Sequence, residues 1–541
     1  MALPEVAETV ADKERQAVAG FFASRNGALA VTAVAAVLSV VSFLYFFSNG
    51  MTNLYGDGIA HVNIARKVVD HPDSSFWQRY IQIGSPWLPL QTAAMLPFVA
   101  NDWMWRTGVA GSIVSMIAFV IAAAALYLHS RHLYRKEDGN YKVTLPPLTA
   151  GIYLLNPSAL FMQATPMSEL IFMAALATGV YLLQSWAAYQ TSKRLILAAA
   201  ALTLATLARY EAWPVAALAV GVVAFAASGT LPTKLKRAAI FAAVVSAGPL
   251  YWLWHNWAIY GDALWFLTGP HSARGIYLQN RANLGWSNIF VGNALLDFGL
   301  MFITVAACVG IAVAFLGVIG LARFLVVKRR EVVENLPALL LVVPFFFHVL
   351  SLYRGEIQIF PLSAFGLLNV RYGLPHLLAL ALFAPLVVPM LGRFGRRRAI
   401  AIVCSIIIVQ YGYLVADGAA QLAVYQEGYR NGVNAKPARQ WARLAAHLRE
   451  HPPPAKILMD TGALGPVVPR GGLRFADIIH EGTTGWHGIT DTIPGEISTI
   501  ILQEGDPLDR RLRENPALTT ALARDFQERF STGKAKVFQR R

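Results

Sequence analysis

Apolar stretches of about 20 residues recur along most of this 541-residue chain, and a helix of that length crosses the roughly 30 Å of hydrocarbon in a bilayer. Hydrophobic residues make up 56% of the sequence and charged residues 14%, whereas about 25% of a soluble domain is charged. A cytosolic enzyme is therefore excluded, and we expect a polytopic α-helical membrane protein. Its eleven predicted spans are residues 27–48, 105–129, 144–160, 167–189, 194–208, 212–228, 238–258, 296–325, 337–353, 373–392 and 399–417.

Basic residues lie in alternate connections between these spans. If residues 1–26 form a cytoplasmic N-terminal segment, every other cytoplasmic connection is basic, which is the usual orientation bias of membrane proteins. Topology thus explains the net charge of +15, and no nucleic-acid partner is indicated. An odd number of spans places the C-terminal segment outside the cytoplasmic membrane. The basic connections carry Arg131, Arg135, Lys136 and Lys142; Lys193 and Arg194; Lys234, Lys236 and Arg237; Lys328, Arg329 and Arg330; Arg393, Arg396, Arg397 and Arg398.

Residues 418–541 follow the last predicted span and have the mixed composition of a folded domain. Helical apolar spacing and short apolar runs predict a small extracytoplasmic α/β domain. Asp460 follows one of its strands, where it would be a turn residue or a ligand contact. The expected elements are a helix around Trp441–Leu448, short strands at 456–460, 497–502 and 534–539, and a helix at 518–530.

The outer loop between the first two spans, residues 49–103, carries its own periodicity. Ile59, Val62 and Ala65 form an apolar stripe, which predicts a helix lying flat in the membrane interface. Asp57 stands at the start of this helix, and His61 follows four residues later on the same face. Either Asp57 caps the helix or it faces a site.

Two further outer turns carry charges next to apolar runs. Ser168 and Glu169 open the fourth predicted span, and a carboxylate at the membrane edge needs water, a partner or a capping role. Arg209 and Glu211 lie between two spans with hardly any polar loop, so we expect them to pair or to face a cavity.

Several arginines lie on the predicted outer face, against the orientation bias. Arginine suits a phosphate in a partly dehydrated site because it forms charge-assisted bidentate hydrogen bonds. Contacts with lipid headgroups, or ion pairs such as Arg354 with Glu356, are the alternative. The residues concerned are Arg274 and Arg281, Arg354, and Arg371 with the adjacent Tyr372.

The outer-loop motif YGDGIAH (Tyr55–His61), followed by Asn63–Arg66, resembles the first-loop motif of GT-C membrane glycosyltransferases. The similarity is closest to protein O-mannosyltransferases and to the aminoarabinose transferases that modify lipid A. Gly84–Leu88 stands where those families have a Lys-Pro-Pro-like turn. Asn156–Ser158 and Ser168–Glu169 also resemble motifs of the glycosylphosphatidylinositol mannosyltransferases. The resemblance covers mainly residues 27–260 and implies a GT-C-like catalytic module over residues 27–417.

This resemblance implies a sugar donor on a polyprenyl phosphate, with the first-loop Asp, here Asp57, as base on the acceptor. Those families have an acidic pair at this position, but Gly58 follows Asp57 here. A second carboxylate must come from Glu169, Glu211 or Asp102. The missing pair leaves both the acceptor type and the use of a divalent cation open.

The residues also fit this chemistry by themselves. Attack of an acceptor hydroxyl on the anomeric carbon needs a base on one side, and stabilisation of the departing phosphate on the other. We expect Asp57 to be the base, Arg371 with Arg274 or Arg281 to hold the phosphate, and the anomeric centre to invert. The other expected site residues are Glu169 and Glu211 as further catalytic carboxylates, and His61, Arg209, Arg354 and Tyr372 as substrate contacts.

The sequence leaves other activities open. A ligase or polymerase of lipid-linked oligosaccharides would share the donor, but would favour a large outer loop late in the chain. A secondary transporter would also place charges such as Arg209 and Glu211 in helices, but the chain shows no related halves. The acceptor, whether protein, lipid or glycan, and the identity of the sugar are not encoded in any motif.

Overall fold

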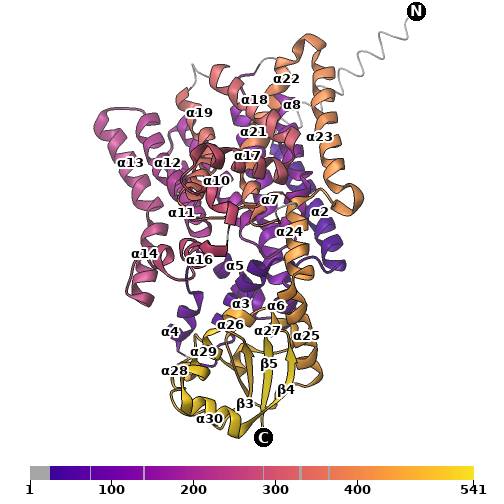
Figure 1. Cartoon of the computed structure of the whole chain (residues 1–541). Helices are drawn as coiled ribbons and strands as arrows, with labels where there is room; N and C mark the ends of the chain where they lie inside the picture. The colour runs from indigo at the N-terminus through magenta and orange to yellow at the C-terminus, as the bar shows by residue number, and fades with distance from the viewer. Residues whose placement is uncertain (1–24, 74, 138–140, 284, 328–331, 363–365) are drawn as a thin grey trace, which may run out of the picture.

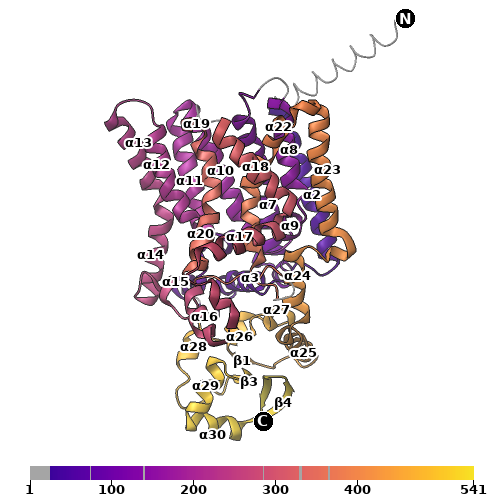
Figure 2. The ribbon, with the colours of Figure 1, turned by 45° about the horizontal axis from the view of Figure 1, so that its top comes forward.

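Long apolar helices fill one end of the molecule, and a small sheet with short helices forms the other (Figure 1). The computed structural model describes residues 25–541 except 74, 138–140, 284, 328–331 and 363–365. Most of the predicted N-terminal segment and the basic residues Lys328–Arg330 lie outside the described residues. Figure 2 shows the long helices running down the picture, with the C-terminal sheet below them.

Seven helices or helix runs within the described ranges are long and apolar enough to cross a membrane. The chain is therefore an integral membrane protein. The runs are built from α2 (Arg25–Ser48), α7 (Val109–Leu133), α10 (Glu169–Tyr189), α13 (Leu231–Val245) with α14 (Ala247–Tyr260), α19 (Val332–Leu339) with α20 (Val343–Tyr353), η7 (Val370–His376) with α21 (Leu377–Phe383) and α22 (Val387–Met390), and α23 (Arg396–Ala419) with α24 (Ala423–Tyr429) and η10 (Arg430–Asn434).

The predicted count of eleven spans is not confirmed, since the structure gives seven, or eight with a bent pair. The expected straight span at 296–325 is that pair: α17 (Ala294–Val309) and α18 (Ile311–Val327) meet at 117°. Gly310 between them has φ +98, which ends one helix and redirects the chain. Three other predicted spans are helices of 14 to 17 residues: α8 (Tyr141–Leu154), α11 (Ser192–Ala208) and α12 (Ala212–Ala226).

The predicted outer-loop helix exists, but its surroundings differ from the expected membrane interface. It is α3 (Gly56–Val69), and its apolar residues Ile59, Val62 and Ala65 are buried. Val62 and Ala65 belong to one apolar cluster with Leu464 and Phe475 of the C-terminal segment, so protein, not lipid, covers the stripe. Neighbouring outer-loop helices are α4 (Phe76–Tyr80), α5 (Leu90–Val99) and α6 (Asp102–Thr107).

The C-terminal unit, residues 436–541, contains a five-stranded sheet with the order β2-β1-β3-β5-β4. The first three strands in this order are parallel and the last three antiparallel. The strands are β1 (Lys456–Met459), β2 (Ile478–Ile479), β3 (Ile497–Gln503), β4 (Phe526–Thr532) and β5 (Ala535–Arg540). Short helices pack beside them: α25 (Lys436–Glu450), α26 (Thr461–Leu464), α27 (Val467–Arg470), α28 (Thr484–His487), α29 (Pro507–Glu514) and α30 (Pro516–Asp525).

The predicted helix at 518–530 is only half correct. Helix α30 ends at Asp525, and β4 begins at Phe526. The last β4 residue, Thr532, pairs with Ala535 across a two-residue turn, where Gly533 has φ +58. A two-residue turn of this kind joins two antiparallel strands in a hairpin. Pairing with β5 therefore makes residues 526–530 a strand, although their apolar spacing also fits a helix.

Helix α3 is fastened to the edge of this sheet where the parallel strands end. Lys67 Nζ donates to Thr461 Oγ1 at 2.6 Å and lies 2.9 Å from Glu481 Oε1. Asn63 Nδ2 donates to the Gly465 carbonyl at 2.9 Å. This edge is where open α/β sheets commonly bind ligands, and here a side chain of the same protein occupies it.

Asp460 lies at the same edge and caps α26, accepting a hydrogen bond from Ala463 N at 2.9 Å. This agrees with a turn role. Burial and the nearby charge of Glu481 raise the pKa of Asp460 to about 6. A carboxyl group whose pKa is raised in the folded state destabilises the fold once it is ionised. The free-energy cost therefore grows between about pH 4 and about pH 6 and stays constant at higher pH.

We therefore expect D460N to stabilise the protein at pH 7.5 by roughly 1–3 kcal/mol and at pH 4 by only a few tenths, because Asn keeps the capping oxygen without the charge. Unfolding of the full chain, followed at both pH values, measures this difference. An equal effect at the two pH values would contradict it.

Candidate functional site

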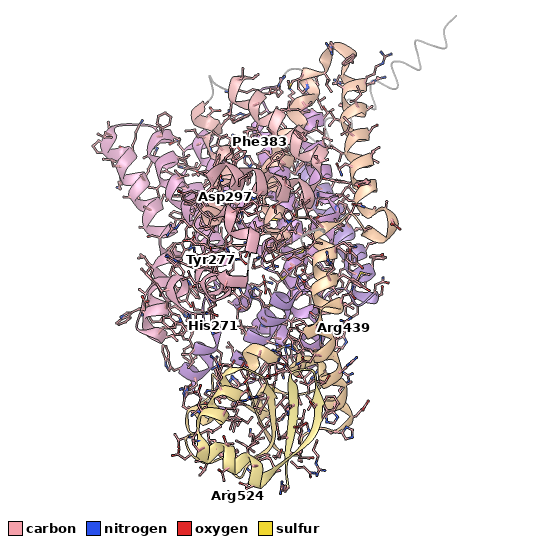
Figure 3. The ribbon with its side chains drawn as sticks, in the orientation of Figure 1. His271, Tyr277, Asp297, Phe383, Arg439 and Arg524 are labelled. Carbon is pink, nitrogen blue, oxygen red and sulfur yellow. The ribbon has the colours of Figure 1, made fainter. Side chains whose placement is uncertain are left out.

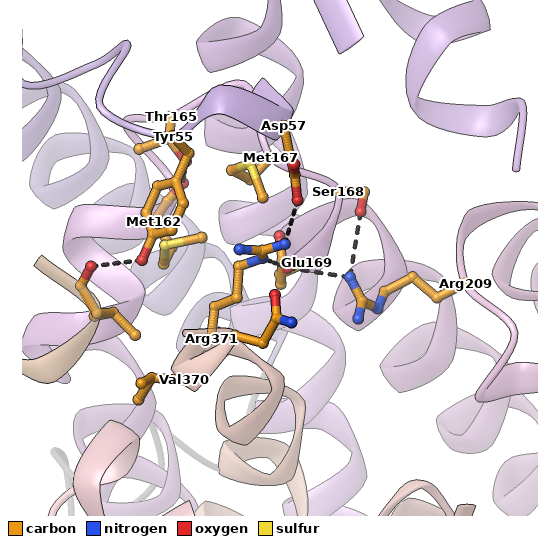
Figure 4. A network of polar contacts seen from close by, with 12 residues as sticks. Tyr55, Asp57, Met162, Thr165, Met167, Ser168, Glu169, Arg209, Val370 and Arg371 are labelled. Atoms are coloured by element: carbon orange, nitrogen blue, oxygen red, sulfur yellow. Dashed lines mark hydrogen bonds and ion pairs between the residues drawn. The ribbon is translucent and has the colours of Figure 1, made fainter. Parts of the chain in front are cut away.

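The side chain of Arg371 is the centre of a buried charged network at the end of the bundle that faces the C-terminal unit. It is 7% exposed, and its guanidinium contacts three carboxylates. Nη2 pairs with Asp57, Nε lies 3.1 Å from Glu169 Oε1, and Nη1 lies 3.5 Å from Glu427 Oε1. Figure 4 shows Arg371 between Asp57 and Glu169.

A second arginine extends the network. Arg209 Nη1 lies 3.1 Å from Glu169 Oε1, and its Nε lies 2.8 Å from Glu211 Oε1. The expected pairing of Arg209 with Glu211 is confirmed. Glu169 thus joins the two arginines, and opposite charges alternate from Asp57 to Glu211.

Helix ends place these groups. Asp57 is the second residue of α3, Glu169 opens α10, and Glu211 immediately precedes α12, while Arg209 directly follows α11. Carboxylates are favoured at helix N-termini and cations at C-termini, so each charge has the sign that its helix end prefers. Glu211 is the N-cap residue of α12 but makes no side-chain capping hydrogen bond to that helix, and its carboxylate instead contacts Arg209.

Glu427 is a member of the network that the sequence analysis missed. It lies in α24, beyond the last predicted span, and is 1% exposed. It accepts hydrogen bonds from the backbone N–H groups of Asn369 and Val370 at 2.6 and 3.0 Å. Glu427 therefore fixes the start of η7, the segment that presents Arg371.

Two buried histidines, also missed, continue the network into the bundle. His348 Nε2 lies 3.0 Å from Glu211 Oε1, and His348 Nδ1 lies 3.3 Å from His376 Nε2. His348 therefore joins Glu211 to His376. His348 also stacks on Tyr372, with ring centroids 5.5 Å apart.

Two predicted contact residues line the same region. The ring of Tyr372 lies 4.9 Å from the guanidinium carbon of Arg209 and 5.5 Å from that of Arg371. His61 is buried one turn after Asp57 and packs on Trp87, with centroids 4.7 Å apart. Burial lowers the pKa of His61 to about 4, so its ring is neutral at pH 7.

Other predicted residues are not brought to the network. Arg274 and Arg281 are exposed, and Arg354, which is 55% exposed, pairs with Glu356 at 2.9 Å. Asp102 pairs with Arg66 at 2.6 Å. We therefore leave these residues out of the candidate site.

The Asn-Pro and Gly-Ser-Pro motifs have structural contacts. Asn156 caps α9 (Pro157–Met162), and its Nδ2 donates to the Val309 carbonyl at 3.1 Å. In the Gly84–Leu88 turn, the Gly84 carbonyl lies 2.9 Å from His255 Nε2, and the Pro86 carbonyl accepts a hydrogen bond from Tyr210. The second motif thus joins the outer loop to α14 and to the turn that carries Arg209.

A divalent cation does not fit the carboxylates as they stand. Asp57, Glu169 and Glu427 all face the Arg371 guanidinium, and the described part of the chain contains no group of three or more His, Cys, Asp or Glu side chains arranged to hold a metal ion. The two guanidinium groups of the network are thus both paired with carboxylates of the protein itself.

No protein-family model matches this chain, and no curated protein matches its sequence. Its structure is similar to that of ArnT from Cupriavidus metallidurans bound to undecaprenyl phosphate: the TM-score is 0.53 at 13% identity, covering 95% of this chain and 98% of that one. It is also similar, at a TM-score of 0.49 and 12% identity, to the oligosaccharyltransferase AglB from Archaeoglobus fulgidus in complex with an inhibitory peptide and a dolichol-phosphate, over 92% of this chain and 71% of that one.

The chain therefore has the GT-C fold of membrane glycosyltransferases. The match with ArnT extends over nearly the whole of both chains, including the C-terminal unit, so it is a likeness of the complete architecture. The resemblance found in short outer-loop motifs is confirmed at the level of the fold.

The shared guanidinium predicts strong coupling between Arg371 and Glu427. R371Q leaves the buried Glu427 carboxylate without a cation, and removing one partner of a buried pair typically costs about 3–5 kcal/mol. Adding E427Q removes the orphaned charge, so R371Q/E427Q should unfold at a higher temperature than R371Q, with a coupling of about 0.5–3 kcal/mol.

Thermal unfolding of the four proteins in detergent measures this cycle. The exposed pair Arg354 and Glu356 serves as the control, because exposed pairs contribute about 0–1 kcal/mol. Additive losses from R371Q and E427Q would show that the two groups do not depend on each other.

Proposed function

We propose that the chain is a glycosyltransferase that moves a sugar from a polyprenyl-phosphate donor to an acceptor hydroxyl at the outer face of the cytoplasmic membrane. The observation that carries the proposal is the Asp57–Arg371 pair, which places a carboxylate next to a buried guanidinium in a GT-C fold. The undecaprenyl phosphate bound to ArnT is a carrier lipid of the kind that such a donor would release, which supports this proposal.

In the proposed reaction, Asp57 accepts the proton of the acceptor hydroxyl while that oxygen attacks the anomeric carbon. The bond from this carbon to the phosphate oxygen breaks, and polyprenyl phosphate leaves with the electron pair. Attack from the side opposite the phosphate inverts the anomeric centre. Arg371 and Arg209 stabilise the charge of the leaving phosphate, an electrostatic contribution that is usually the largest in a water-poor site.

The charges of the network indicate how the donor enters. Four carboxylates, those of Asp57, Glu169, Glu211 and Glu427, surround two guanidinium groups. The Asp57 side chain is 42% exposed, whereas that of Glu169 is fully buried. A donor phosphate would therefore replace Asp57 on Arg371 and leave the buried pairs intact.

The remaining assignments follow from the sequence. We propose that residues 27–417 form the catalytic module, with residues 1–26 in the cytoplasm and residues 418–541 outside. The basic connections support this orientation, because positive residues favour the cytoplasmic side. The acceptor is a protein, lipid or glycan that carries a free hydroxyl.

Replacing Asp57 by Asn should lower transfer by about 10²–10⁴-fold, because the amide cannot take the proton. Binding of polyprenyl phosphate should remain or become tighter, since the amide competes less well for Arg371. The measurement uses the full chain in vesicles without a solute gradient, with labelled sugar on polyprenyl phosphate and a mixture of envelope acceptors.

D477N is the matched control, because Asp477 is an exposed carboxylate paired with Arg474 in the C-terminal unit. It should transfer like the unmodified protein. Full turnover by D57N would remove Asp57 as the base. Passage of label across the membrane without transfer would favour a transporter.

A further inference from the structure

Helix α25 carries a stripe of cations that the proposed reaction does not use. Lys436, Arg439 and Arg443 have the spacing i, i+3, i+7, which places them on one face of the helix, and all three are exposed. The opposite face is apolar and packs into the C-terminal unit through Ala438, Leu444, Ala445 and Leu448. We call Lys436, Arg439 and Arg443 the α25 stripe.

The α25 stripe has no carboxylate partner within the part of the chain that the structure describes. Three other exposed arginines of the same unit do: Arg474, Arg513 and Arg524 lie within 3.0 Å of Asp477, Asp509 and Asp525. The guanidinium and ammonium groups of the α25 stripe are therefore available to an anion from outside the chain.

The position of the stripe indicates where that anion lies. The run from α23 to η10 is the last membrane span, and α25 begins two residues after η10 ends. Tyr429 and Val433, directly before the stripe, are 38% and 41% exposed, which suits the boundary between hydrocarbon and headgroups. Tyr55, just before α3, donates a hydrogen bond to the Val424 carbonyl, so this connection is held against the outer loop.

The figures agree with a position beside the membrane surface. Figure 3 places Arg439 at the side of the molecule, where the C-terminal unit meets the bundle, and Arg524 at the end farthest from the bundle. Figure 2 shows α25 nearly end-on while the spans run down the picture, so its axis crosses their direction. A helix in this orientation can present one long face to a bilayer.

We propose that the α25 stripe binds the phosphates of anionic phospholipid headgroups in the leaflet that faces the C-terminal unit. Arginine and lysine next to a membrane span attract anionic lipid, and arginine holds phosphate through charge-assisted hydrogen bonds. This contact would fix the C-terminal unit against the bilayer on the side where α24 and η10 leave it. The proposal depends on charge and position and not on the glycosyltransferase assignment.

The test compares the full chain with K436Q/R439Q/R443Q in an uncharged detergent, using native mass spectrometry with added phosphatidylglycerol or phosphatidylcholine. Each cation near a membrane surface contributes about fivefold in affinity, so the triple variant should bind phosphatidylglycerol about 100-fold more weakly. Binding of phosphatidylcholine should not change. The preference of the unmodified chain for phosphatidylglycerol over phosphatidylcholine should fall as the salt concentration rises, because salt screens the charges.

R510Q/R524Q/R529Q is the charge-matched control, because these exposed arginines also belong to the C-terminal unit, and Figure 3 places Arg524 far from the spans. It should keep the preference for phosphatidylglycerol. Equal binding by the unmodified chain and the α25 variant would overturn the proposal, as would an equal loss in the control. All three replaced residues of each variant are exposed, and matching unfolding temperatures confirm that the variants are folded.

Discussion

One guanidinium, that of Arg371, ties together three segments that are far apart in the sequence. Its carboxylate partners come from the outer loop, from the start of α10 and from α24 in the last helix run. A buried cation is tolerated only when it is paired and hydrogen-bonded, so each partner constrains where the others lie. The backbone hydrogen bonds of Glu427 to the start of η7 make the position of Arg371 depend on the chain that leaves the membrane.

Much of the site was predictable because its charges interrupt apolar runs. A charge next to an apolar run is costly without a partner, and this argument selected Glu169, Arg209 and Glu211. Asp57 was selected by its place at the start of the outer-loop helix, and Arg371 because it lies on the predicted outer face against the orientation bias. The argument from charge could not select Glu427, which lies among other polar residues. It could not select His348 and His376 either, because they are histidines inside apolar runs and the argument considered only carboxylates and arginines. Nor could it show that the two guanidinium groups share Glu169, because that contact joins α10, the end of α11 and η7.

The fold could be predicted where the hydrophobic pattern of a segment matches what that segment contacts in the structure. The positions of the long apolar helices and of strands β1, β3 and β5 follow from apolar runs. The stripe of α3 was assigned to lipid because amphipathic spacing alone does not distinguish lipid from a protein surface. The bend at Gly310 was also missed, since the apolar run passes through it without interruption. Whether a run crosses straight or turns depends on backbone conformation at one residue and on the packing of α17 against η7.

Helix α3 links the two halves of the protein mechanically. Its 14 residues extend about 21 Å, with Asp57 near one end and Lys67 near the other. Asp57 is held by the bundle, and Lys67 by the edge of the sheet. A rigid helix held at both ends transmits displacement, so a movement of the sheet would shift Asp57, the carboxylate that we propose as the base. Tilting the C-terminal unit against the bundle would therefore misalign Asp57 without replacement of any residue of the network.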